Sequence, residues 1–273
     1  LEKIEEMTKG NRKIGLGVMG WADVLAMMGI PYNSDRALEL AEEVMEFINT
    51  NAKAASVELA KTRGVFPNFK NSIHDTGREE DMVRNASWTT IAPTGTLSTL
   101  ANCSGGIEPF FMIVYRRGSI YDAEGKPTIE LLMENETFKR VAVERELYSE
   151  ELAMKIAETG SLQHIDEIPH DIKEVFVTAH DIDYEWHVKM QSAFQKHVTN
   201  AVSKTINFPN DATVDDIKKS YQLAYKLGNI KGITVYRDGC KEYQVLSVKE
   251  TKPSAVEGIV DRLRTHRPRN WRR

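Results

Sequence analysis

Residues 204–239 read KTINFPNDATVDDIKKSYQLAYKLGNIKGITVYRDG. The opening letters KTINF predict a strand, and GITVY at 232–236 predicts another, because both runs are rich in β-branched and aromatic side chains. Between them, Thr213 and Asp216 have the spacing of a helix capping box, and Gly228 is placed to end that helix. Strand, helix and strand in so short a span form a βαβ unit with parallel strands, so the sequence predicts an α/β fold.

The chain upstream alternates expected helices with short extended segments. Ser34 is a good N-cap for a long helix that should run to about Thr62 and stop at Gly64. SWTTIA at 87–92 is β-prone, and Phe110 to Tyr115 should be a further buried extended segment. Helical patterns are predicted at 21–28, 128–159 and 184–199.

Composition and charge exclude several classes of protein. The 273 residues carry a formal net charge of −4, which gives no electrostatic reason to expect binding to nucleic acid or to a membrane surface. Apolar runs are far shorter than the roughly 20 residues of a membrane-spanning helix. Cys103 and Cys240 are too few for a disulfide framework and are expected as inert thiols in a reducing cytoplasm. We therefore expect a cytoplasmic protein.

The two ends of the chain differ from its middle. The chain opens at Leu1 with a charged pattern typical of mid-helix, from which we expect a fragment whose N-terminal part lies elsewhere. Residues 1–246 are expected to be the folded part. Residues 247–273 are polar and then strongly basic without periodicity, which predicts a disordered tail.

The segment after the extended run 87–92 is the first candidate site, and it consists of Pro93, Thr94, Gly95, Thr96, Leu97 and Ser98. Hydroxyls and backbone N–H groups with little side-chain bulk can cradle a phosphate, especially if a helix begins at Leu97. A plain turn from strand to helix explains the same residues.

The loop NCSGGIEP at 102–109 is the second candidate. Gly105 and Gly106 beside Glu108 allow the backbone to approach a ligand, although a surface loop with a solvated carboxylate is the simpler interpretation of these residues by themselves. Tyr236 ends a predicted strand at the rim where α/β folds bind ligands, or is a core tyrosine. His180 and His187 match no metal-ligand spacing, so no metal site is predicted.

Four sequence blocks together resemble the catalytic subunit of ribonucleotide reductase, and their residues are most similar to those of its adenosylcobalamin-dependent class. They are NRKIGLGVMGWAD at 11–23, APTGTLS at 92–98 with NCSGGIEP at 102–109, QKH at 195–197 followed by NAVSKTIN at 200–207, and GITVYRDG at 232–239. The resemblance implies the C-terminal half of a ten-stranded α/β barrel. It also implies radical reduction of ribonucleotides, expected to be ribonucleoside diphosphates, for DNA synthesis.

The resemblance further implies partners and site residues. In this family a finger-loop cysteine becomes a thiyl radical generated by adenosylcobalamin, and a cysteine pair, reloaded by a thioredoxin-like or dithiol reductant, supplies electrons. The chain lacks that finger loop and the first reducing cysteine, so no catalytic residue is assigned and the missing N-terminal half of the barrel is an expected partner. The implied substrate-phosphate cradle is Pro93 to Ser98, with Gly105, Gly106 and Glu108 as part of the active-site rim. The position of Tyr236 at the end of its predicted strand adds this residue to the same rim.

Two alternatives stay open. In the first alternative, the chain is a non-catalytic nucleotide-binding remnant or the partner half of a split enzyme. In the second, it is a fragment of the iron-dependent class of the same family, which passes a radical through paired tyrosines. GITVYRDG holds only Tyr236, preceded by Val235, which speaks against that relay.

Overall fold

The computed structural model describes residues 1–121 and 127–240, so the predicted tail lies outside the described residues. Two compact units are present, one formed by Leu1–Phe111 with Pro169–Cys240 and the other containing Met112–Ile168. The first unit holds α1 (Glu2–Asn11), α2 (Trp21–Met27), α3 (Asp35–Arg63), the 3₁₀ helix η1 (Glu79–Asp81), α4 (Gly95–Ala101), α7 (His170–Val175), α8 (Tyr184–Gln195), β3 (Thr205–Phe208), α9 (Val214–Leu227) and β4 (Thr234–Arg237). The second holds β1 (Val114–Tyr121), β2 (Pro127–Glu134), α5 (Glu136–Glu144) and α6 (Glu150–Thr159).

Local capping sets the ends of the long helices. The Ser34 hydroxyl accepts a hydrogen bond from the Ala37 amide at 3.2 Å, and Gly64 ends α3 with a φ of 73°. At α9 the capping box is complete, because Thr213 and Asp216 exchange side-chain and backbone hydrogen bonds. These caps confirm the predicted helix boundaries.

Short parallel contacts arrange the extended segments in one direction. Leu16 pairs with Thr89, Ile91 pairs with Val202, and β3 pairs with β4 in parallel register. The predicted βαβ unit is therefore confirmed. A Cβ added at Gly17 would lie 2.1 Å from the Thr90 carbonyl oxygen, so glycine is needed for this approach of the two backbones.

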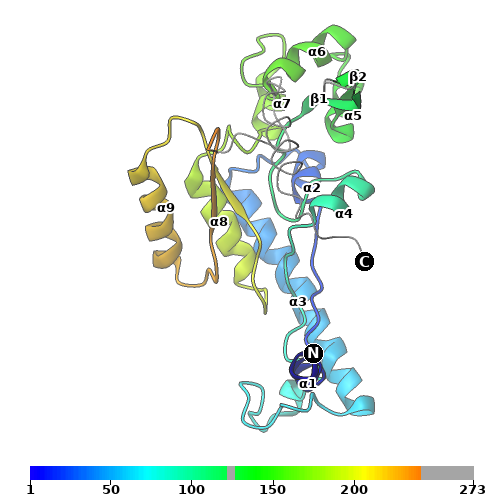
Figure 1. The fold of residues 1–273 in the computed structure, drawn as a ribbon, viewed down its shortest axis with the longest axis vertical. Coiled ribbons are helices and arrows are strands. Elements are labelled where there is room, and N and C mark those ends of the chain that lie inside the picture. The colour runs from blue at the N-terminus through cyan, green and yellow to red at the C-terminus, as the bar shows by residue number, and fades with distance from the viewer. Residues whose placement is uncertain (122–126, 241–273) are drawn as a thin grey trace, which may run out of the picture. The chain divides into compact units, whose positions relative to one another are not determined.

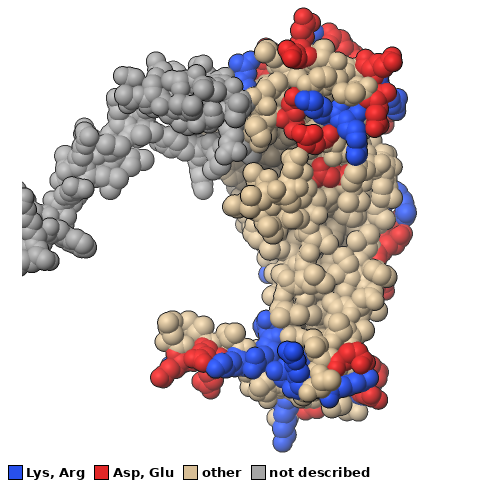
Figure 2. All heavy atoms as spheres, turned by 90° about the vertical axis from the view of Figure 1, so that its right-hand side faces the viewer, with Lys and Arg blue, Asp and Glu red and all other residues tan. Residues whose placement is uncertain are grey.

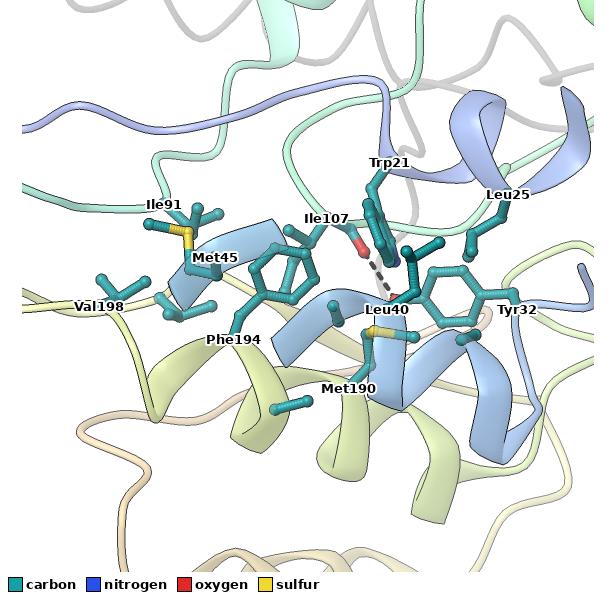
Figure 3. Packing of buried hydrophobic residues seen from close by; sticks show 14 of the residues in the cluster. Trp21, Leu25, Tyr32, Leu40, Met45, Ile91, Ile107, Met190, Phe194 and Val198 are labelled. Carbon is teal, nitrogen blue, oxygen red and sulfur yellow. Dashed lines mark hydrogen bonds between the residues drawn. The ribbon is translucent and has the colours of Figure 1, made fainter. Parts of the chain in front are cut away.

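The main core lies where α2, α3 and α8 meet the extended segments (Figure 3). Trp21 packs edge-on against Phe194 with ring centroids 5.1 Å apart, and Met45 and Met190 are completely buried beside them. In Figure 1, α8 lies between α3 and α9, and it contacts both of them as well as β3. A smaller cluster behind β3 contains Val188, Ile206, Phe208 and Ala224. The apolar spacing of α3 and α8 is thus explained by burial.

The second unit differs from the prediction. The helical pattern expected over 128–159 is wrong in its first part, because β2 is a strand that pairs antiparallel with β1. The letters TIELLME at 128–134 contain good helix formers, and pairing with β1 overrides that preference. Helices α5 and α6 follow, each capped by a side chain, Asn135 and Ser149 respectively.

The surface of the molecule is unevenly charged. Figure 2 shows a face on which lysine, arginine, aspartate and glutamate are sparse over its middle. Ile14, Leu16, Leu97 and Leu100 are among the large apolar residues of the first unit that are more than half exposed. No helix in the described part of the chain combines the length and the apolar character needed to cross a membrane.

Candidate functional site

The predicted phosphate segment forms the start of α4. The helix begins at Gly95, two residues before the predicted start at Leu97, and Thr94 adopts left-handed backbone geometry with a φ of 50°. No side chain caps this N-terminus, so the amides of Gly95, Thr96 and Leu97 are the ones that a first helical turn leaves without an intrahelical partner. These three residues are exposed. A Cβ added at Gly95 would meet no atom within 4 Å, so the approach to these amides is open.

The hydroxyl groups of the segment have different roles. The Thr94 hydroxyl oxygen accepts a hydrogen bond from the Gly106 amide at 2.7 Å, which leaves its own hydrogen available for donation. Ser98 is buried and its hydroxyl donates to the Gly95 carbonyl at 3.2 Å. Thr96 is exposed at the start of the helix, whereas Pro93 lines a cleft of about 430 Å³ with Ala92 and Thr234.

Hydrogen bonds hold the loop 102–108 beside this segment. The Ser104 amide donates to Asp23 Oδ2 at 2.7 Å, and its hydroxyl oxygen accepts from the Ala22 amide at 3.2 Å. Gly106 has a φ of 48°, and a Cβ there would lie 3.0 Å from the Ala92 carbonyl oxygen. Glycine is therefore favoured at this position both by the backbone conformation and by the lack of space for a side chain. The structure thus brings Gly105 and Gly106 together with the cradle.

Glu108 turns toward the interior and is bound to the start of β3. Its Oε2 accepts a hydrogen bond from Lys204 Nζ at 2.5 Å, and its Oε1 accepts one from the Thr205 amide at 2.6 Å. The Lys204 side chain has no exposed surface, whereas 28% of the Glu108 side chain is exposed. The solvated-carboxylate interpretation of this loop is therefore wrong, since both carboxylate oxygens are bound within the protein.

Lys204 and His187 complete a buried polar cluster that the sequence did not reveal. Lys204 Nζ also donates to His187 Nδ1 at 2.7 Å, and His187 Nε2 lies 3.1 Å from the Ala179 carbonyl oxygen. Burial, followed by the Lys204 ammonium, holds the pKa of His187 well below its usual value. Burial lowers the pKa of Lys204, and Glu108 opposes that shift. His187 is thus neutral, with its hydrogen on Nε2.

Tyr236 and the cysteines occupy other surroundings. Tyr236 lies half-buried on β4, paired in register with Asn207 of β3. Cys103 is half-buried, and burial followed by the charge of Asp23 raises the pKa of its thiol. Cys240 is exposed. A raised thiol pKa disfavours a reactive thiolate at Cys103. Across residues 1–121 and 127–240, His, Cys, Asp and Glu side chains form no group of three or more that could hold a metal ion.

Comparison with known proteins identifies the family. The family model described as "Ribonucleotide reductase, barrel domain" matches residues 1–236. The chain belongs to the ribonucleotide reductase family. The resemblance of the four sequence blocks is thereby confirmed, as is the barrel-type α/β fold class.

Similar proteins carry vitamin B12-dependent names. The vitamin B12-dependent ribonucleoside-diphosphate reductase of Thermoplasma acidophilum is 46% identical over 263 residues, which are 96% of this chain and 33% of that protein. The protein of the same name from Mycobacterium tuberculosis strain H37Rv is 43% identical over 251 residues, 92% of this chain and 34% of that protein. This ribonucleotide reductase chain therefore spans about a third of the length of these curated relatives.

A solved structure supports the fold. The alpha subunit of the class Id ribonucleotide reductase from Actinobacillus ureae superposes with a TM-score of 0.71 at 24% identity, covering 86% of this chain and 40% of that chain. At this identity the likeness establishes only the fold.

Proposed function

We propose that this chain supplies the substrate-phosphate site of an adenosylcobalamin-dependent ribonucleotide reductase that acts in the cytoplasm. In the reaction, the ribose 2′ hydroxyl leaves as water and hydrogen takes its place, while a dithiol gives up two electrons and becomes a disulfide. Relatives named ribonucleoside-diphosphate reductases support diphosphates as the substrate class.

The uncapped start of α4 carries the proposal. The three consecutive residues Gly95, Thr96 and Leu97 are exposed at this helix start, and Thr94 and Thr96 bring two hydroxyl groups to the same turn. Amide and hydroxyl donors gathered at one helix start suit the several acceptor oxygens of a phosphate. Each charge-assisted hydrogen bond contributes about 1.5–3 kcal/mol, so two or three of them are enough to orient a nucleotide.

We propose that the residues that break the bonds of the substrate belong to a part of the enzyme outside this chain. Neither Cys103, with its raised thiol pKa, nor the exposed Cys240 matches a family catalytic cysteine. The relatives are about three times as long as this chain, and exposed apolar side chains such as Leu16 and Leu100 offer contact surface for additional chain. In this proposal the described residues bind and orient the substrate, and a thioredoxin-like or dithiol reductant acts through the remaining part.

Adenosylcobalamin would supply the radical by homolysis of its cobalt–carbon bond. The described residues do not fit this group. Clefts of about 430 Å³ beside Pro93, about 470 Å³ beside His180 and about 730 Å³ beside Glu42 have sizes that suit ordinary small ligands, and a corrinoid is larger than any of these three. We therefore assign no described residue to holding the cofactor.

A non-catalytic nucleotide-binding role is the second candidate. The observation in its favour is that the exposed helix start is present while burial raises the thiol pKa of Cys103 and so disfavours a reactive thiolate there. Binding without turnover, in a protein that contains the whole reductase length, would favour this candidate over the first.

The cradle is tested by titrating the chain with a nucleoside diphosphate and following the amide resonances of Gly95, Thr96 and Leu97. Gly95→Val should abolish binding, because the branched side chain would fill the open approach without meeting protein atoms at its Cβ. Thr96→Ala should weaken binding about tenfold or more through one lost charge-assisted hydrogen bond.

Thr99→Ala is the matched control on the same helix, since the Thr99 hydroxyl donates to the Gly95 carbonyl at 3.0 Å within α4. It should leave affinity nearly unchanged. If Gly95→Val and Thr96→Ala both bind nucleotide as tightly as the unaltered chain, the segment is only a turn and the site assignment is wrong.

A further inference from the structure

Lys204 is a buried cation whose three hydrogens are all committed inside the protein. Its Nζ donates to Glu108 Oε2 at 2.5 Å, to His187 Nδ1 at 2.7 Å and to the Thr205 carbonyl oxygen at 2.5 Å. Because its side chain has no exposed surface, it cannot itself touch a nucleotide. Any effect of Lys204 on the cradle must pass through the residues that it holds.

Glu108 transmits that hold to the loop. Its second oxygen accepts from the Thr205 amide at 2.6 Å, so the carboxylate is attached to two consecutive residues at the start of β3. The neighbouring Ile107 carbonyl accepts from the Tyr32 hydroxyl at 2.6 Å, which fixes the loop to the main core (Figure 3). Residues 107 and 108 are therefore bound from two independent elements.

The same loop determines the geometry of the cradle. The Gly106 amide donates to Thr94 Oγ1 at 2.7 Å, and the loop backbone lies directly against the Ala92 and Pro93 carbonyls. Thr94 has a φ of 50°, a left-handed conformation that a β-branched residue adopts only when its surroundings impose it. Thr94 immediately precedes the exposed amides of α4.

We propose that the buried Glu108–Lys204 ion pair is a positioning device for the phosphate cradle, acting through the Gly106 amide and Thr94. The inference rests on the proposed function, because it assigns the pair to the same phosphate site. Lys204 and Glu108 act through the loop and are positioning residues. The pair sets the loop, the loop imposes the left-handed turn at Thr94, and that turn directs the first amides of α4 toward the ligand.

Lys204→Met tests the device, because methionine keeps an unbranched side chain and removes the charge and the three donated hydrogen bonds. The probe is a nucleoside diphosphate titrated into the chain. The temperature is kept well below the unfolding midpoint of the variant. We expect at least a tenfold loss of affinity. The Gly106 amide resonance should shift and its hydrogen exchange should accelerate.

The matched control is Lys231→Met. Lys231 also donates to backbone carbonyls, those of Val198, Thr199 and Asn200 at 2.8–3.3 Å, but it has no hydrogen bond to the 102–108 loop. Its replacement should change affinity less than twofold and leave the Gly106 amide signal in place.

Two further variants separate positioning from a general loss of structure. Thr94→Ala should share the loss, and adding Lys204→Met to Thr94→Ala should cost little more, because both act along one route. Glu108→Gln covers the case in which Lys204→Met does not fold. It keeps an acceptor for the Thr205 amide while removing the charge, and it should show the same Gly106 shift with a smaller affinity loss.

The outcomes distinguish the two claims. If the unaltered chain binds and Lys204→Met or Glu108→Gln binds equally well, the positioning role is overturned while the cradle stands. The same holds if Thr94→Ala and Lys204→Met weaken binding independently. If the unaltered chain binds no nucleoside diphosphate, the cradle assignment fails and the positioning role fails with it.

Discussion

Neutral His187 makes the fold sensitive to mild acid. Protonation would place an imidazolium beside the Lys204 ammonium, whose Nζ lies 2.7 Å from His187 Nδ1, in a site without exposed surface. Burial, Lys204 and, more weakly, His180 all lower the pKa of His187 from its usual value of 6.5. The unfolded chain therefore takes up this proton first as the pH falls.

The magnitude follows from that difference in proton uptake. Because the folded-state pKa is lowered, the contribution of His187 to the free energy of unfolding is complete above about pH 6.5 and is lost as the pH falls toward the folded-state value. Between pH 7.5 and pH 5.5, proton uptake by His187 in the unfolded state raises the equilibrium constant of unfolding about tenfold. This lowers the free energy of unfolding by about 1.4 kcal/mol.

Urea unfolding at these two pH values measures the effect. His187→Asn removes the titration and keeps a side-chain oxygen that can accept from Lys204. It should be less stable at pH 7.5 but should lose about 1.4 kcal/mol less than the unaltered chain on going to pH 5.5. His170→Asn, at an exposed histidine, is the control and should retain the full loss. Equal pH dependence in the His187→Asn variant and the unaltered chain would refute the neutral-histidine assignment.

The remaining predictions concern backbone packing and activity. Gly17→Ala should lower the free energy of unfolding by about 3 kcal/mol or more, because its Cβ would lie 2.1 Å from the Thr90 carbonyl oxygen. Gly232→Ala, whose Cβ meets no atom within 4 Å, should be nearly neutral in the same urea titration, and equal losses would contradict the packing argument. The chain by itself should reduce no ribonucleotide in the presence of adenosylcobalamin and a dithiol, since neither cysteine matches a catalytic position; measurable turnover would point to Cys103.

Elements set by local chemistry were predictable from the sequence. The caps at Ser34 and Thr213 depend on side chains within three residues of the amides that they bind, so their spacing alone reveals them. The parallel strands of the βαβ unit follow from the length of the connection between them. The family resemblance added the place of the cradle, which stays a prediction.

Elements set by distant partners were not predictable. The strand β2 exists because β1 pairs with it, and its own letters favour a helix. The cluster of Glu108, His187 and Lys204 joins residues that lie 96 and 17 positions apart in the sequence. One signal was present, because Lys204 opens a run otherwise typical of a buried strand, and a lysine there requires a buried anion.

The cost of that lysine supports a role beyond stability. A buried ion pair loses hydration that its mutual attraction barely recovers, and apolar side chains of similar volume often stabilise a fold equally well. Apolar packing, however, is not directional and does not fix the orientation of a loop as hydrogen bonds do. Glu108 reaches the Thr205 amide and Lys204 through opposite oxygens, and this pairing, together with the Tyr32 hydroxyl that donates to the Ile107 carbonyl, sets the orientation of residues 105–108. Two residues before Glu108, the Gly106 amide donates to the hydroxyl oxygen of Thr94, the residue that adopts the left-handed turn. An interaction that is poor as a source of stability is therefore well suited to fix the position of one loop against the helix start that we propose to bind phosphate.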